Sequence, residues 1–136
     1  MRFFFYGTLL DADVRAAVLG KLAPVEIEPA TLKGWRRLAL AGLVFPIARP
    51  HWSSSIDGLL ARGLSAEAGR LLDLYEGPGY KRHEVELTTG VAAILYAEDG
   101  SRAFEALPVP WDFDIWLRRH KPAYLAAIAK SPQSPR

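Results

Sequence analysis

The chain begins with an uninterrupted apolar stretch, which restricts its possible folds more than any other feature of the sequence. Phe3, Phe4, Phe5 and Tyr6 follow one another directly before Gly7. A short aromatic run of this kind predicts a buried strand. We therefore expect the rest of the chain to be arranged around this strand.

The predicted strand ends at Gly7-Thr8, and Asp11 and Asp13 then lead into a helical pattern. A glycine at the end of a strand lets the backbone turn sharply, or approach a ligand where a Cβ would clash. Successive N–H groups in such a turn can form a concave site for an anion. Two interpretations follow: a loop that binds a carboxylate or an oxyanion, and an ordinary turn between a strand and a helix.

A second stretch places a carboxylate at the end of a helix. Ser65 is typical of a helix start, and the Gly77-Pro78-Gly79 sequence predicts an abrupt end. Apolar residues at helical spacing predict one buried face, namely Ala68, Leu71, Leu72 and Tyr75. Glu76 is the last residue before the turn. By position alone it fits equally a surface glutamate that faces Lys81 or Arg82.

The remaining pattern predicts mostly short strands. We expect strands over residues 25–32, 35–40, 44–48, 55–62, 80–88, 91–97 and 102–106, and helices over 13–19, 65–76, 112–120 and 122–129. Residues 49–55 are expected to form a loop that carries His51 and Trp52, Asp99-Gly100 a hairpin turn, and Pro108 and Pro110 the end of the sheet. Seven or so strands with few helices suggest an α+β fold, a small β-barrel with flanking short helices.

Composition limits the class of protein. With 136 residues, half of them hydrophobic, the sequence predicts a single domain over residues 1–130 and a disordered tail over 131–136. Because the chain has no cysteine, disulfides, cysteine-ligated zinc and thiol catalysis are excluded, and a reducing cytoplasm is the expected location. The three histidines do not have metal-ligand spacing, so we expect no metal site.

The charge pattern does not indicate a nucleic-acid or membrane partner. The formal net charge is +2, and Lys and Arg are scattered apart from Arg36-Arg37 and residues 118–121. Aromatic and basic residues do not alternate along a strand, as an RNA-binding sheet would require. The longest apolar run, residues 38–48, falls short of the ~20 residues that span a bilayer. The first residues also lack the small-residue cleavage site of a signal peptide.

Four motifs in the same order resemble those of one family. Tyr6-Gly7-Thr8-Leu9 matches a loop after the first strand, and Glu76 with Gly77, Tyr80 and Arg82 matches the surroundings of an acid/base glutamate. Between them lie Val44-Phe45-Pro46-Ile47 and Asp57-Gly58-Leu59-Leu60. Together these motifs resemble the gamma-glutamylcyclotransferase-like superfamily, and most closely its gamma-glutamylamine cyclotransferase and plant avirulence-induced-gene branch.

The resemblance implies a fold and a reaction. It implies a mixed-topology barrel with a cavity at its mouth, and a small gamma-glutamyl substrate that needs no cofactor. The alpha-amine of this substrate attacks its own side-chain carbonyl, which releases 5-oxoproline and an amine or amino acid. Glu76 is then the general acid/base, because burial in an apolar cavity brings a carboxyl towards a working pKa. The implied substrate-binding residues are Tyr6, Gly7, Thr8, Leu9 and Tyr80.

Two other functions remain open on the same fold: an enzyme that removes a different acyl group, and a non-catalytic module that binds a small molecule. The sequence does not indicate an oligomeric state. The cyclotransferase hypothesis makes one geometric prediction. The Tyr6–Leu9 loop and a partly buried Glu76 must line one pocket, with room for a folded glutamyl group between them.

Overall fold

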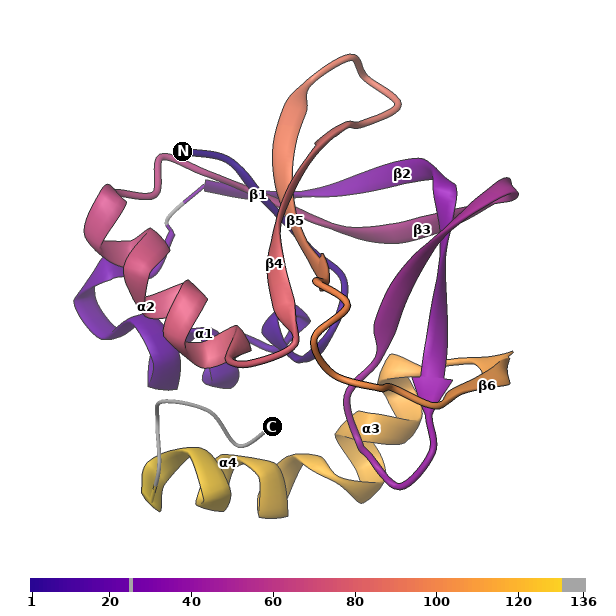
Figure 1. The fold of residues 1–136 in the computed structure, drawn as a ribbon. Helices are drawn as coiled ribbons and strands as arrows, with labels where there is room; N and C mark the ends of the chain where they lie inside the picture. Colours follow the sequence, from indigo (N-terminus) through magenta and orange to yellow (C-terminus); the bar gives the residue numbers. More distant parts are fainter. Residues whose placement is uncertain (25, 131–136) are drawn as a thin grey trace.

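The computed structural model describes residues 1–24 and 26–130. The expected strand start at Val25 and the expected disordered tail over 131–136 lie outside the described residues. The elements follow in the order β1 Phe3–Phe5, η1 Thr8–Leu10, α1 Ala12–Leu19, η2 Gly20–Leu22, β2 Glu26–Leu40, β3 Ile47–Arg62, α2 Ala66–Glu76, β4 Tyr80–Glu86, β5 Ala92–Glu98, β6 Ala106–Pro110, α3 Phe113–Arg119 and α4 Lys121–Lys130 (Figure 1).

Strand β1 lies inside the sheet and is buried on both faces. It pairs antiparallel with β3 and parallel with β5. Side chains alternate between the two faces of a strand. Phe3 and Phe5 accordingly belong to one core cluster, and Phe4 and Tyr6 belong to the other. This double burial explains why every position of the first stretch is apolar.

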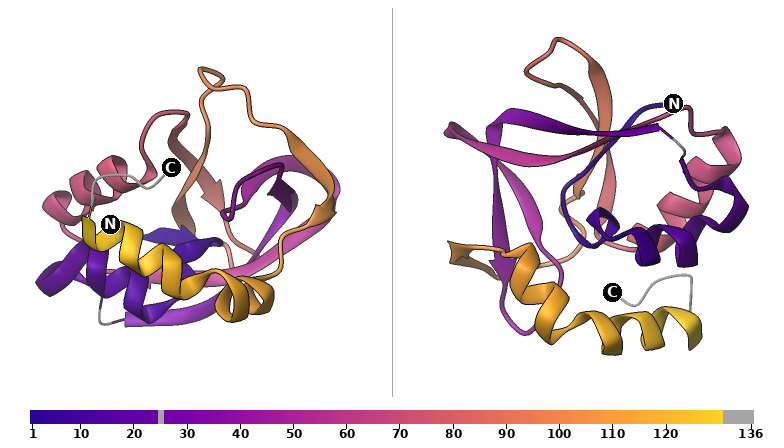
Figure 2. Two further views of the ribbon diagram at one scale, coloured as in Figure 1. Left: turned by 90° about the horizontal axis from the view of Figure 1, so that it is seen from below. Right: turned by 180° about the vertical axis from the view of Figure 1, so that it is seen from behind.

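Over the described residues, six strands form one mixed sheet in the order β4-β5-β1-β3-β2-β6. The sheet is strongly curled, and helices α1, α2 and α4 gather on one side of it (Figures 1 and 2). The predicted α+β class is confirmed, with six strands in place of the seven or so expected. No helix of the described residues is long and apolar enough to cross a membrane.

The β2–β3 hairpin differs most from the expected pattern. Residues 35–40 continue the strand that precedes them, and β3 includes the whole of the expected loop, residues 49–55. The two strands pair along nearly their whole length, with a register shift between Lys33 and Trp35. Gly34, with φ of +84°, lies at this shift and lets the hairpin bend without ending. Long-range pairing therefore overrides the turn-like local sequence.

The position of strand β6 also differs from the predicted one. The expected strand over 102–106 and the hairpin at Asp99-Gly100 are wrong, because the strand is Ala106–Pro110 and it pairs with β2. The two prolines that were expected to end the sheet lie within this strand. An edge strand tolerates proline because one side of its backbone needs no ladder partner.

The N-terminal cap of α2 is the residue that the sequence predicts, whereas that of α1 is a different residue. The Ser65 side chain accepts a hydrogen bond from the Ala68 N–H at the start of α2, as expected. In α1 the cap is Asp11, whose carboxylate accepts from the Val14 N–H at 3.1 Å. Asp13, the expected cap, lies in the first turn.

Candidate active site

The loop that follows β1 is tightly packed. Thr8–Leu10 form a single turn of 3-10 helix, and the Leu10 N–H donates to the Gly7 carbonyl at 3.0 Å. Gly7 itself has φ of −119°, so a left-handed backbone does not explain the glycine. A Cβ at this position would instead lie 3.1 Å from the Pro46 ring. The glycine therefore leaves room for the close approach of Pro46, in the segment that precedes β3.

Glu76 is the last residue of α2, and its exposed fraction is only 6%. The helix ends there because Gly77 takes φ of +69° and donates its N–H to the Asp73 carbonyl. Buried glutamates are rare, since burial removes the hydration of a charge. The alternative of a surface glutamate is therefore wrong, and the burial is deeper than the partial burial that we expected.

One cavity joins the loop and the carboxylate. It is lined by Tyr6, Gly7, Thr8 and Leu9 from the loop, by Glu76, and by Phe4, Phe5, Pro46 and Tyr96. The tertiary structure thus brings together two motifs that lie far apart in the sequence. The cavity measures about 20 Å³, which is the space of roughly one water molecule. The expected room for a folded glutamyl group is therefore missing from this conformation.

The Thr8 side chain contacts two tyrosines. Its hydroxyl lies 2.5 Å from the Tyr75 hydroxyl, which lies 2.5 Å from that of Tyr124. All three residues are buried. They belong to the loop, α2 and α4, so this hydroxyl cluster fixes the loop against two helices. No local sequence pattern marks Tyr124 as part of the site, because only the fold brings α4 to the loop.

Two further tyrosines hold the walls of the cavity. The Tyr6 hydroxyl donates to the Tyr96 carbonyl at 2.5 Å. Tyr80 is not among the residues that line the cavity; its hydroxyl donates to the Pro46 carbonyl at 3.0 Å. Its ring packs against Phe104, with the ring centroids 5.2 Å apart. Tyr80 thus lies behind Pro46, and its substrate-binding role stays a prediction.

Arg82 pairs with Asp73. Its Nε lies 2.8 Å from one Asp73 oxygen, which also accepts from the Tyr96 hydroxyl at 2.5 Å. Burial favours the neutral form of Asp73, but these hydrogen bonds outweigh it and hold the pKa of Asp73 below its ordinary value. Burial, and then the Asp73 carboxylate, raise the pKa of Tyr96 far above its usual range. Tyr96 is therefore a phenol that donates to Asp73 and lines the cavity.

The chemistry that the cavity offers is that of a buried carboxyl group. Among the described residues, no three His, Asp or Glu side chains come together in a way that could hold a metal ion. The cavity instead combines one buried carboxyl with a backbone loop and aromatic walls. A carboxyl in such a position can accept a proton and return it to a neighbouring atom.

Comparison with known proteins establishes the family. The family model described as gamma-glutamyl cyclotransferase, AIG2-like, matches residues 3–111, so the chain belongs to this family. AIG2-like protein C of Arabidopsis thaliana is 28% identical over 131 residues, which cover 93% of this chain and 75% of that protein. Protein AIG2 A of the same plant is 29% identical over 135 residues, with coverage of 93% and 76%.

Solved structures share the fold. A solution structure of an Arabidopsis thaliana protein matches with a TM-score of 0.67 and 27% identity, over 95% of this chain and 79% of that one. A structure named gamma-glutamyl cyclotransferase matches with a TM-score of 0.61 over 77% of this chain and 68% of that one. At 16% identity, this second match supports the fold alone.

Proposed function

We propose that this chain is a gamma-glutamyl cyclotransferase-type enzyme, with Glu76 as its general acid/base. The observation that carries the proposal is the shared cavity of Glu76 and the Tyr6–Leu9 loop, in a chain of the cyclotransferase family. The proposed catalytic unit is a single domain over residues 1–130, and its proposed location is the cytoplasm.

The proposed reaction is intramolecular. The alpha-amine nitrogen of the substrate attacks the gamma-carbonyl carbon and forms a five-membered ring. Glu76 takes the proton that the attacking nitrogen loses and gives it to the leaving nitrogen as the original amide bond breaks. The products are 5-oxoproline and the released amine or amino acid. Holding the substrate in its folded form supplies much of the rate, because the two reacting groups already belong to one molecule.

In this proposal the loop binds the substrate. Backbone N–H groups of residues 7–9 hold the substrate carboxylate or the developing oxyanion, where fixed donors are most effective. The Thr8 hydroxyl positions the loop through the cluster with Tyr75 and Tyr124. Tyr6 and Leu9 supply cavity wall. Since the cavity is nearly filled, substrate entry requires the loop, Pro46 or Tyr80 behind it to move.

The test is a screen of gamma-glutamyl amines, gamma-glutamyl dipeptides and glutathione for release of 5-oxoproline. We expect one of these classes to be turned over. The leaving group that gives the highest kcat/KM defines the substrate class.

A non-catalytic binding module is the second candidate. The volume of the cavity does not separate the two functions, because either ligand needs the same movement of the cavity wall to enter. Such a module would bind 5-oxoproline or a gamma-glutamyl compound with no turnover of any of them. Saturable binding without product would therefore select this function over the enzyme.

A further inference from the structure

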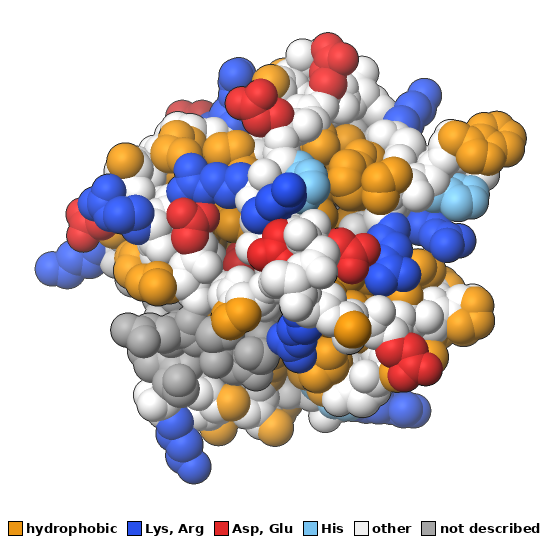
Figure 3. Space-filling view, in the orientation of Figure 1, with side chains coloured by type: hydrophobic (Ala, Val, Ile, Leu, Met, Phe, Trp, Pro, Cys, Tyr) orange, Lys and Arg blue, Asp and Glu red, His pale blue; other side chains and the backbone are white. Residues whose placement is uncertain are grey.

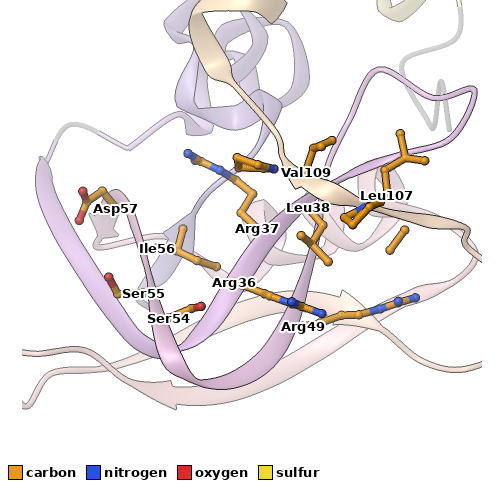
Figure 4. Close-up of a pocket in the computed structure, with 13 residues that line it drawn as sticks. Arg36, Arg37, Leu38, Arg49, Ser54, Ser55, Ile56, Asp57, Leu107 and Val109 are labelled. Carbon is orange, nitrogen blue, oxygen red and sulfur yellow. The ribbon is translucent and has the colours of Figure 1, made fainter.

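A second and much larger pocket lies on the β2–β3 hairpin. It has a volume of about 570 Å³, within the usual range for small-molecule sites. Its walls come from β2, β3 and the edge strand β6 (Figure 4). It shares no lining residue with the cavity of Glu76. The cyclotransferase proposal therefore leaves this pocket without a role.

The lining of this pocket is mainly positive. Arg36, Arg37 and Arg49 contribute three cations, and Asp57 is the single carboxylate among the described residues that line it. A group of Lys and Arg side chains lies over the hairpin on the face shown in Figure 3. Figure 4 shows Asp57, Ser55 and Ser54 following one another along β3 towards Arg36 and Arg49. Arg36 and Arg49 thus lie away from Asp57, whereas Arg37 lies close enough to interact with its charge.

Two of the arginines face each other across the strands. Arg36 of β2 and Arg49 of β3 are direct cross-strand partners. Like charges in this position repel each other and weaken a sheet. Arg49 is compensated by Glu98, with Nε 2.7 Å from the carboxylate oxygen. Arg36 has no ion pair with any described residue, so an anion beside it would relieve the repulsion.

Arg37, the next residue of β2, points to the other face of the strand and is held there (Figure 4). Its Nη1 donates to the Tyr6 carbonyl at 2.9 Å, and its guanidinium lies 5.4 Å from the ring centre of Trp111. No carboxylate of the described residues forms an ion pair with it. Burial lowers the pKa of Arg37, and the more distant Asp112 and Asp57 offset this only in part. Arg37 therefore adds positive charge near the pocket, and Arg36 is the arginine that can contact a ligand there.

We propose that this pocket binds a small organic anion, a carboxylate or phosphate carried on an apolar body. Arg36 holds the charged group through charge-assisted hydrogen bonds, on the face of the hairpin that it shares with Arg49, and Ser55 offers a hydroxyl donor. The apolar body lies against Leu107 and Val109 of β6, which Figure 4 shows on the wall opposite the serines.

The proposal is independent of the reaction at Glu76. The hydrogen bond between Arg37 and the Tyr6 carbonyl gives Arg37 a structural role in holding β2 against the loop. This role explains neither the position of Arg36 nor the volume of the pocket. Arg36 therefore decides between a ligand site and a purely structural role for these cations.

The experiment follows backbone amide NMR signals of the full chain during titration with three probes. Phenyl phosphate and phenylacetate carry the two candidate anionic groups, and 2-phenylethanol is a neutral analogue of similar size. We expect saturable shifts at Arg36, Ser54, Ser55 and Leu107 with at least one anion, and binding at least about tenfold weaker for the neutral probe. The anion that binds more tightly identifies the charged group of the natural ligand.

Two variants with the same net charge make the test specific. Arg36→Gln should weaken anion binding about three- to tenfold without lowering the melting temperature, because the side chain is exposed and its removal relieves the repulsion with Arg49. Arg118→Gln removes a charge from α3, away from the pocket, and should bind like the wild type. Equal affinities for the two variants, no saturable shift with either anion at millimolar concentration, or shifts confined to the Glu76 cavity would each overturn the proposal.

Discussion

At the scale of single residues, the proposed reaction depends most on Glu76. It is a buried carboxyl at the end of a helix, next to a backbone loop. We predict that Glu76→Gln lowers 5-oxoproline release about a hundredfold to ten-thousandfold and leaves the fold intact, because Gln keeps the size but cannot take the proton. Product release and the melting temperature measure the two effects.

The control for this variant is Glu67→Gln, an exposed change in the first turn of the same helix. Its turnover should equal that of the wild type. Wild-type turnover in the Glu76→Gln variant would remove Glu76 from the mechanism.

Gly7 is the second residue whose role follows from a single contact. A Cβ at Gly7 would lie 3.1 Å from the Pro46 ring, which is a tight contact. We predict that Gly7→Ala raises KM and lowers stability, and that the larger Gly7→Val does so more strongly. Enzyme kinetics and urea unfolding provide the measurements.

Pro46→Ala removes the ring atoms that the new Cβ would meet. The double variant should therefore recover part of the loss, as a favourable coupling between the two sites. Purely additive effects would show that the contact with Pro46 is not the reason for the glycine.

At the scale of secondary-structure elements, the hydroxyl cluster joins the loop to α2 and α4. We predict that Tyr75→Phe costs about 1–3 kcal/mol of unfolding free energy, because the buried hydroxyls of Thr8 and Tyr124 lose a partner. Thr31→Val removes an exposed hydrogen bond to Asp57 and should cost less. Urea denaturation compares the two variants, and an equal cost would argue against a role of the cluster in stability.

We expect the contact of Asp73 on α2 with Arg82 of β4 and Tyr96 of β5 to depend on pH. Since the pKa of Asp73 is lowered in the folded protein, its contribution to stability is present above the unfolded pKa of about 3.9. It disappears as the pH falls through the lower folded pKa. We predict that wild type and Asp73→Asn differ in melting temperature at neutral pH, and that the difference shrinks below about pH 4.

The exposed Glu86 supplies the control for this pH series. Glu86→Gln should show no comparable trend in the melting-temperature difference. A difference for Asp73→Asn that stays constant down to the most acidic pH would contradict the assignment of the effect to this carboxylate.

At the scale of the whole molecule, Lys121 connects the two ends of the chain. Its Nζ lies 2.9 Å from Asp11 and 2.8 Å from Asp13, and so ties the start of α4 to α1. Because the Asp11 carboxylate is buried, loss of the lysine leaves a charge without its counter-ion. We predict that Lys121→Met lowers the melting temperature clearly more than Lys130→Met, which changes a lysine in the last turn of the same helix. Equal melting temperatures would show that the pair does not hold the helices together.

The elements differ in how far local sequence predicts them. Helix α2 has the boundaries that Ser65 and Gly77 indicate, because capping and the left-handed glycine are local effects. Residues 49–55 resemble a loop locally but form part of β3, since pairing with β2 outweighs their weak propensity. The bounds of β6 differ from the predicted strand for a related reason. Proline is tolerated in a strand at the edge of a sheet, and the local sequence does not reveal that β6 lies at the edge.

The sequence by itself determined the buried first strand, the cap and end of α2, the α+β class and the family, through motifs that act locally or recur in order. The tertiary structure decided which groups meet. It placed Glu76 in one cavity with the Tyr6–Leu9 loop and brought the Tyr124 hydroxyl to that of Thr8. It also paired Arg82 with Asp73. It also bent the β2–β3 hairpin around a pocket lined by three arginines. Such contacts depend on strand order and on the curl of the sheet, which long-range pairing sets and no local pattern encodes.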